Sequence, residues 1–163
     1  MPVPVLADPA SFNEIVWEIV RQVPRTIVTT FGQIASMIPT PDGVDPTEFE
    51  SYGGQLVGFA MNAVSGSDEP TVPWHRVINS KGMVAMSETN RMRPVQHERL
   101  KAEGLPFSTK GAIDLNLYGW DGPDPAWIAE HRLLPPRPIK KPASPEAKAD
   151  DDGDPPQQLS LFW

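Results

Sequence analysis

The chain of 163 residues contains no cysteine. This absence excludes disulfide bonds, cysteine-based zinc sites and every reaction that needs a thiolate nucleophile, and it fits a reducing cytoplasm. Long apolar runs are also missing, because none approaches the roughly 20 residues of a membrane span. The N-terminus has no basic segment followed by an apolar one, as a signal peptide would. We therefore expect a cytoplasmic protein without a membrane partner.

Positive charge is scarce as well. The chain holds 14 Lys and Arg against 21 Asp and Glu, a net charge of −7, and residues 1–122 alone have a net charge of −5. Binding to nucleic acid without sequence preference depends on basic groups that contact phosphates. On charge alone, the better interpretation is an acidic protein with no nucleic-acid partner. A DNA-binding surface would have to gather its basic groups on one face, and the candidates cluster late in the domain: Arg76, Arg91, Arg93, Arg99 and Lys101.

The composition changes after Gly122. Nine of the last 41 residues are proline, and Asp150 to Asp152 form an acidic run. Such a composition cannot bury enough apolar surface to offset the entropy of folding. We therefore expect one folded domain over residues 1–122 and a Pro-rich, acidic, disordered tail over 123–163, in which only a short helix near 126–133 could form.

Apolar periodicity, capping residues and turn residues predict a mostly helical domain. Ser11 with Glu14 is the expected capping box of the first helix, and Gly104 is the expected end of the last. In chain order we expect a helix over 12–23, an extended segment over 27–30, a short helix over 33–37, a loop over 39–52, a helix over 54–64, a hairpin over 77–84, a helix over 94–103 and an extended segment over 105–120.

Two of these helices are compatible with a helix-turn-helix. The short helix over 33–37 is followed by a Gly- and Ala-rich helix over 54–64, and the hairpin about residues 79–82 has the place of a wing. Gly54, Gly58 and Ala60 would let another backbone approach the second helix closely. The same pattern also fits two core helices of any small α domain. The expected fold class is mostly α, with a winged-helix-like DNA-binding domain and a disordered C-terminal tail.

One heptapeptide is more specific than these patterns. Val72-Pro73-Trp74-His75-Arg76-Val77-Ile78 resembles the P-C-H-R-V active-site segment of the O6-alkylguanine-DNA alkyltransferases, with Trp74 in the place of the alkyl-accepting cysteine. Further motifs resemble that family in the same order over roughly residues 11–122. They are V-T-T-F-G-Q-I-A from Val28, Q-L-V-G from Gln55, L-K-A-E-G from Leu100 and D-L-N-L-Y-G-W from Asp114. The chain is similar to the non-enzymatic branch, the alkyltransferase-like proteins.

The resemblance implies a protein that binds O6-alkylguanine in duplex DNA, flips the base and transfers no alkyl group. It also implies minor-groove docking of the helix over 54–64, handover to nucleotide excision repair proteins, and no metal or cofactor. An indole beside a base pocket can stack on an extruded base and cover its alkyl group. Without its neighbours, Trp74 would be read as a core residue after a turn. The expected pocket residues are Pro73, Trp74, His75, Ser87 and Glu103.

Other matched positions carry expected roles from the same resemblance. His75 and Glu103 match the pair that activates the cysteine in the enzymes, and here we expect them to form a hydrogen-bonded scaffold. A buried histidine and glutamate that serve only the structure of a domain would form the same hydrogen-bonded pair, so this pair is weak evidence for function. Arg76 is expected to brace the loop, and the residues expected near DNA are Phe31, Gln55, Gly58, Arg76, Arg91 and Arg93.

Phe31 and Gln55 depart from the family pattern. The family has a tyrosine at the first position, where it contacts a phosphate, and an arginine at the second, where it fills the gap left by the flipped base. Each departure loses a donor, which should weaken flipping by roughly 1 kcal/mol or more. After the wing, residues 85–88 also diverge from the family, and we expect a wider lid over the base.

The end of the chain carries a second resemblance. Gln158-Leu159-Ser160-Leu161-Phe162 resembles the peptide by which bacterial DNA polymerases and repair proteins dock on the sliding clamp. A disordered tether that presents a glutamine and three apolar side chains suits a preformed groove. Chance is the alternative. The resemblance implies a bacterial, nucleoid-associated protein, which we expect to be a monomer.

Two other functions stay open. One is a winged-helix DNA-binding or regulatory protein without lesion specificity, which Pro73, His75 and Glu103 argue against. The other is a sliding-clamp-tethered interaction module whose domain has lost DNA affinity, which Phe31, Gln55 and the domain charge favour. An alkyltransferase of the familiar mechanism is excluded, because the chain has no sulfur nucleophile.

Overall fold

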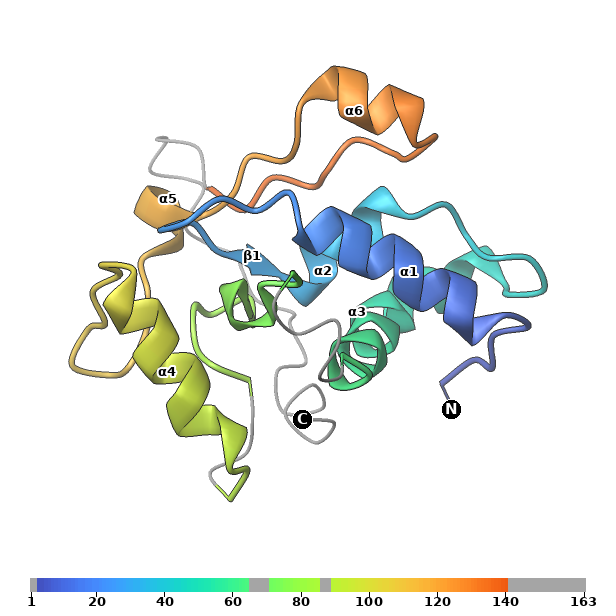
Figure 1. Ribbon diagram of the computed structural model, residues 1–163. Helices are drawn as coiled ribbons and strands as arrows, with labels where there is room; N and C mark the ends of the chain where they lie inside the picture. The colour runs from blue at the N-terminus through green and yellow to red at the C-terminus, as the bar shows by residue number, and fades with distance from the viewer. Residues whose placement is uncertain (1–2, 65–70, 86–88, 141–163) are drawn as a thin grey trace.

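A computed structural model describes residues 3–64, 71–85 and 89–140. Within these ranges the chain is mostly helical with one two-stranded sheet, which confirms the predicted class (Figure 1). The elements are α1 (Pro9–Val20), β1 (Thr29–Thr30), α2 (Phe31–Met37), α3 (Pro46–Asn62), the 3-10 turn η1 (Trp74–Arg76), β2 (Val77–Ile78), α4 (Met92–Ala102), α5 (Leu115–Tyr118) and α6 (Pro125–Glu130). None of the described helices is long and apolar enough to cross a membrane.

Two helices begin earlier than predicted, each at an Asp-Pro pair. Asp8 caps α1 by accepting from Ser11 N at 3.1 Å, so the expected capping box of Ser11 and Glu14 is wrong. Asp45 caps α3 by accepting from the amides of Thr47 and Glu48, so part of the expected loop over 39–52 is helical. Proline at the first helical position has a fixed φ and lacks the amide that would be unpaired there, which is why the pair starts a helix.

Helix α3 packs across α1 and α2. Phe12 and Phe49 meet edge to face with ring centroids 6.2 Å apart, and Trp17 Nε1 donates to Ala60 O at 2.9 Å. A Cβ at Gly53 would lie 2.9 Å from Ala35 Cβ. A close helix approach therefore occurs at Gly53; of the positions predicted for one, Ala60 is in contact through its carbonyl and Gly58 has no described atom within 4 Å of a built Cβ.

The predicted hairpin over 77–84 is wrong in its pairing. Strand β2 runs parallel to β1, with Thr29 opposite Val77, and residues 83–84 form no strand. The turn itself is present, because Asn79 N donates to Met83 O at 2.9 Å. Gly82, at φ 81°, lies against residue 113, where a Cβ would be 2.3 Å from Ile113 O. Gly82, within the turn, therefore pairs with residue 113, because Ile113 N donates to Gly82 O at 2.8 Å.

The second half of the domain follows the prediction more closely. Helix α4 ends at Ala102, and Gly104 follows with a φ of 96°, as expected of the residue after a helix. The expected extended segment over 105–120 is interrupted by α5, because Asp114 accepts from Asn116 N and starts a helical turn.

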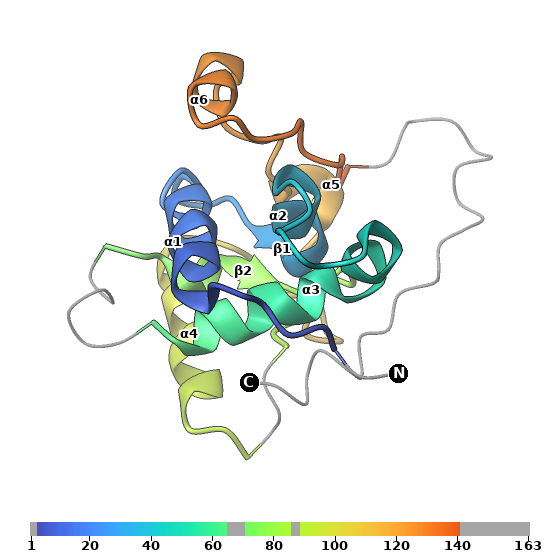
Figure 2. The ribbon, with the colours of Figure 1, turned by 90° about the vertical axis from the view of Figure 1, so that its right-hand side faces the viewer.

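The packed region continues to Lys140, beyond the predicted boundary at residue 122. Gln33 Nε2 donates to Arg137 O at 3.0 Å, and Leu134 N donates to Met37 O at 2.8 Å. Trp127, Ile128 and Leu133 pack partly buried against the core. The disorder expected over 123–140 is therefore wrong, and the expected short helix is present as α6. In both ribbon views α6 lies on the opposite side of the molecule from α4 (Figures 1 and 2).

Candidate nucleic-acid interface

The segment from Pro73 to Ile78 is held from two sides. Strand β2 pairs with β1, and Gln96 of α4 donates its Nε2 to the carbonyls of His75 and Val77, at 3.0 Å each. A side chain that donates to two carbonyls two residues apart on one loop fixes the path of that loop. Trp74 and His75 are therefore presented by a short turn clamped between a strand and a helix.

Glu103, at the end of α4, links this loop to the rest of the domain. Its Oε2 accepts from His75 Nε2 at 2.7 Å and from Arg76 Nη2 at 2.7 Å, and its Oε1 accepts from Thr26 N at 3.0 Å. Arg76 Nη1 also donates to Val23 O at 2.7 Å. One carboxylate thus joins three chain segments, and Arg76 braces the loop as predicted.

These contacts determine the charge states of the pair. Burial alone would raise the pKa of Glu103, but hydrogen bonds from Arg76, His75 and Thr26 outweigh it and lower the pKa to about 2. Burial lowers the pKa of His75, against the opposing effect of Glu103. A carboxylate can only accept, so the proton of neutral His75 lies on Nε2. Its Nδ1 is a lone-pair acceptor with no hydrogen-bond partner among the described residues.

Trp74 lies between His75 and α4. Its ring meets the His75 ring edge to face, with centroids 6.3 Å apart. The Arg99 guanidinium carbon lies 5.2 Å from the Trp74 ring centroid, which is cation–π distance. Trp74 is 5% exposed. The indole at the position predicted for base stacking therefore has a cation over one face.

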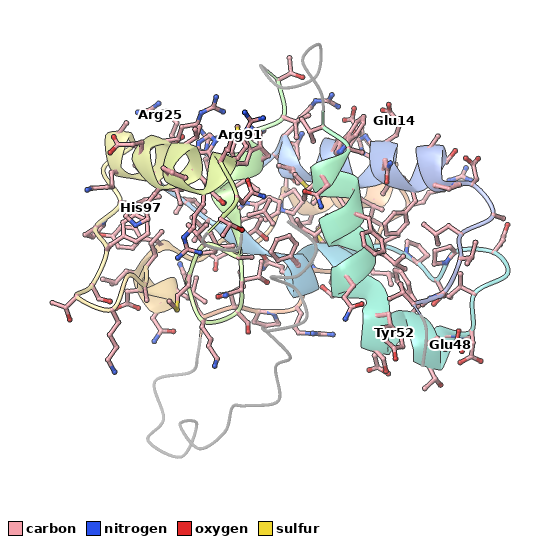
Figure 3. The ribbon with its side chains drawn as sticks, turned by 90° about the horizontal axis from the view of Figure 1, so that it is seen from below. Glu14, Arg25, Glu48, Tyr52, Arg91 and His97 are labelled. Atoms are coloured by element: carbon pink, nitrogen blue, oxygen red, sulfur yellow. The ribbon has the colours of Figure 1, made fainter. Side chains whose placement is uncertain are left out.

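Basic charge gathers on α4 although the chain is acidic. Four of the eleven positions from 91 to 101 are basic, Arg91, Arg93, Arg99 and Lys101, against one acid, Glu98. Figure 3, seen from the side of α3 and α4, shows Arg25 and Arg91 together beside α4, with Glu14 and Glu48 at the other end of the molecule. Within residues 91–101 basic groups thus outnumber acids four to one, which makes this segment the candidate for contact with phosphates.

The residues expected near DNA differ in how far they are exposed and in what they contact. Phe31 is fully buried in the core, and Gln55 is 6% exposed on α3. No heavy atom of the described residues lies within 4 Å of a Cβ built on Gly58. The guanidinium of Arg76 is occupied by Glu103 and Val23, so the structure supports its bracing role and gives no support to DNA contact.

Some predicted residues lie outside the described ranges, namely Ser87 with the expected lid, and the peptide 158–162. Conversely, sequence reasoning missed Gln96 and Thr26, which hold the loop and the carboxylate. It also missed Gln33, which is 2% exposed and donates to Trp120 O and Arg137 O. A buried glutamine or a backbone amide gives no periodic or motif signal.

These features define a class of protein. A small helical domain holds a Pro-Trp-His-Arg turn with a glutamate, and a tryptophan stands where the alkyltransferases have their alkyl-accepting cysteine, so the fold and this turn define an alkyltransferase-like DNA-binding protein. A family model described as "6-O-methylguanine DNA methyltransferase, DNA binding domain" matches residues 11–105, and the chain belongs to this family.

Named relatives agree with this assignment. The chain is 34% identical over 111 residues to the DNA base-flipping protein of Escherichia coli, covering 68% of this chain and 75% of the relative. It is 35% identical over 113 residues to alkyltransferase-like protein 1 of Schizosaccharomyces pombe, covering 67% of this chain and 94% of the relative. The S. pombe protein in complex with damaged DNA containing O6-carboxymethylguanine is a structural match. Its TM-score is 0.51 at 31% identity, and the match covers 68% of this chain and 94% of that one.

Proposed function

We propose that this protein binds O6-alkylguanine in duplex DNA, with the modified base flipped out of the helix against Trp74. The observation that carries the proposal is the placement of Trp74. It stands on a turn fixed by β2, Gln96 and Glu103, beside the basic helix α4. The structural match to a relative bound to DNA containing O6-carboxymethylguanine supports this choice of lesion.

His75 adds a polar contact to this proposal. Neutral His75 has its Nε2 proton committed to Glu103, and Nδ1 has a lone pair without a partner among the described residues. Trp74 is 5% exposed and Nδ1 is buried, so the residues that cover them must move before a flipped base reaches them; the exocyclic amino group that an O6-alkylated guanine keeps can then donate to Nδ1. Trp74 would supply stacking and His75 an orienting hydrogen bond, while neither side chain can accept an alkyl group as a thiolate does.

The first experiment compares two labelled duplexes that differ only in one O6-methylguanine, by fluorescence anisotropy at two salt concentrations. Stacking on one aromatic side chain is worth about 1–3 kcal/mol per base. We therefore expect Trp74→Ala to remove a lesion preference of at least about fivefold. Arg99→Gln removes the cation over the indole and should lower the preference without unfolding the domain.

Trp127→Ala is the matched control, because it removes an indole from α6 on the opposite side of the molecule. It should leave the lesion preference unchanged. Equal binding of the wild-type protein to both duplexes would contradict the proposal and favour a winged-helix protein without lesion specificity. No binding to either duplex would favour the clamp-tethered module.

The proposal extends to two partners. Because the alkyl group stays on the base, another system must remove the lesion. We propose that this system is nucleotide excision repair, acting on the DNA of the nucleoid.

We also propose that residues 158–162 dock on a bacterial sliding clamp. Leu161→Ala with Phe162→Ala should abolish binding of the full chain to purified clamp and leave its DNA affinity unchanged. Lys148→Ala, also in the tail, is the control, and clamp binding that survives the double substitution would contradict docking.

A further inference from the structure

A cavity of about 570 Å³ lies between α1, the segment over 38–42 and the α6 region. None of the residues expected to bind DNA lines it. Helix α6 lies on the opposite side of the molecule from α4 (Figures 1 and 2), so the cavity is not on the basic face. A ligand bound there would leave α4 free to meet DNA.

The interior of the cavity is apolar. Phe12 and Ile15 of α1 face it from one side, Ile38 from a second, and Trp127 and Leu133 from the α6 region. Ile15 is 36% exposed and is among the large apolar side chains that solvent reaches most easily. Apolar side chains from three segments thus surround an open space, and a ligand bound there would displace water from them.

The rim of the cavity is acidic. Four carboxylates line it, Asp8, Glu14, Glu18 and Asp42, against one arginine, Arg132. Asp8 caps α1 and Glu18 pairs with Arg21 at 2.8 Å. Glu14 and Asp42 are exposed and have no hydrogen-bond or ion-pair partner among the described residues. An occupant with positive charge beside apolar groups would therefore be complementary, whereas phosphate groups of nucleic acid or anionic lipid would be repelled.

The cavity is long in one direction. Its residues on α1 extend from Asp8 to Glu18, which at 1.5 Å per residue is about 15 Å along the helix. That length equals nearly three turns of a second helix, and the volume suits a few large side chains. Recognition of an amphipathic helix in an apolar groove has this shape.

We propose that this cavity, the α1–α6 groove, is a docking site for a partner protein's amphipathic helix whose apolar residues are flanked by Lys and Arg. One wall of the groove comes from residues 127–133, which lie beyond the family match over 11–105. The site is thus built by the segment that this chain adds to the family domain. A partner held there could be recruited while the opposite face binds DNA.

The test uses a fluorescein-labelled helical peptide of about 14 residues with leucines at i, i+4 and i+7 and lysines beside them. A second peptide has glutamate in place of every lysine. We expect the full-length protein to bind the lysine peptide at least about tenfold more tightly than the glutamate peptide by anisotropy. This preference should shrink at high salt, since exposed charges are then screened.

Substitutions in the groove test whether the lysine peptide binds there. Glu14→Lys with Asp42→Lys reverses the two unpaired rim charges and should weaken the lysine peptide at least about tenfold, and Ile15→Lys should do the same. Glu50→Lys, an exposed charge reversal on α3 outside the groove, is the control and should change little. Saturating DNA should not displace the peptide.

Three results would overturn the proposal. They are equal binding of both peptides, lysine-peptide binding that survives the groove variants, and displacement by DNA. A concentration-dependent dimer that Ile15→Lys dissociates would also overturn it, because a second copy of this chain would then be the occupant. The readout is independent of lesion recognition, so failure here leaves the proposed function untouched.

Discussion

Glu103 is the residue on which the candidate site depends most. A single carboxylate receives donors from His75, Arg76 and Thr26, and the side chain is 5% exposed. In a protein without a thiol, this cluster has no proton to remove from a nucleophile. Its role here is to hold the turn that carries Trp74, and the strength of that hold is measurable.

Replacing Glu103 with glutamine should destabilise the domain. The substitution keeps the shape but removes the charge that pairs with partly buried Arg76, and breaking one partner of a largely buried pair costs about 3 kcal/mol. We expect a fall in Tm of several degrees by calorimetry at pH 7. Glu98→Gln, on the exposed side of the same helix, should change the Tm little, and an equal effect of both variants would contradict this role.

The pH dependence of stability follows from the same residue. The pKa of Glu103 in the folded protein is about 2, below its ordinary value of 4.5, so the unfolded chain takes up the proton first as the pH falls. The stability that Glu103 contributes is complete above pH 4.5 and is lost as the pH falls toward 2. The Tm difference between wild type and Glu103→Gln should therefore shrink over that window. A difference that stays constant from pH 6 to 2 would contradict the assignment.

At the scale of elements, α3 has two glycines with opposite surroundings. A Cβ at Gly53 would lie 2.9 Å from Ala35 Cβ, whereas one at Gly58 would meet no heavy atom of the described residues within 4 Å. The first glycine permits the packing of α3 on α2. The second is itself buried, yet the described residues leave room for a methyl group beside it.

Alanine at these two positions should give opposite effects on stability. Gly58→Ala should stabilise α3 by about 0.5–1 kcal/mol, since alanine is the better helix former, and should weaken DNA binding if the proposed docking holds. Gly53→Ala should destabilise the domain by about 1–3 kcal/mol, because its Cβ would clash with Ala35. Denaturant unfolding and duplex anisotropy measure both. Unchanged DNA affinity in Gly58→Ala would show that this part of α3 is not against DNA.

For the whole molecule, the distribution of charge matters more than its sum. A net charge of −7 opposes any approach to DNA, and the basic groups on and beside α4 favour it. Affinity should therefore be low for undamaged DNA and sensitive to salt. This arrangement makes the lesion contacts at Trp74 the main source of selectivity.

The salt dependence of DNA affinity measures how many basic side chains contact phosphates. If three or four basic groups of α4 meet phosphates, a plot of log affinity against log salt should have a slope of about −3. Arg91→Gln should reduce the steepness by about 1. Arg132→Gln, just after α6 on the opposite side of the molecule from α4, should leave it unchanged, and a flat plot for the wild-type protein would mean that α4 does not contact the backbone.

The predictions from sequence succeeded where a residue's local chemistry decides the outcome. The helices around α2 and α4, the turn at 79–82, the end at Gly104 and the pairing of His75 with Glu103 all follow from motifs or local propensity. The helix starts at Asp8 and Asp45 were missed because the apolar period begins later than the cap. The partner of β2 was missed because parallel pairing joins residues 48 positions apart.

By itself the sequence determined the family and the chemistry that is absent, because a motif such as Pro73 to Val77 is local and the lack of cysteine is a matter of composition. Only the tertiary structure decided where the domain ends, since residues 123–140 have a polar, Pro-rich composition and are ordered through distant partners such as Gln33 and Met37. It also decided which charges surround the α1–α6 groove. Such placements depend on contacts between segments far apart in the chain, and no local pattern records them.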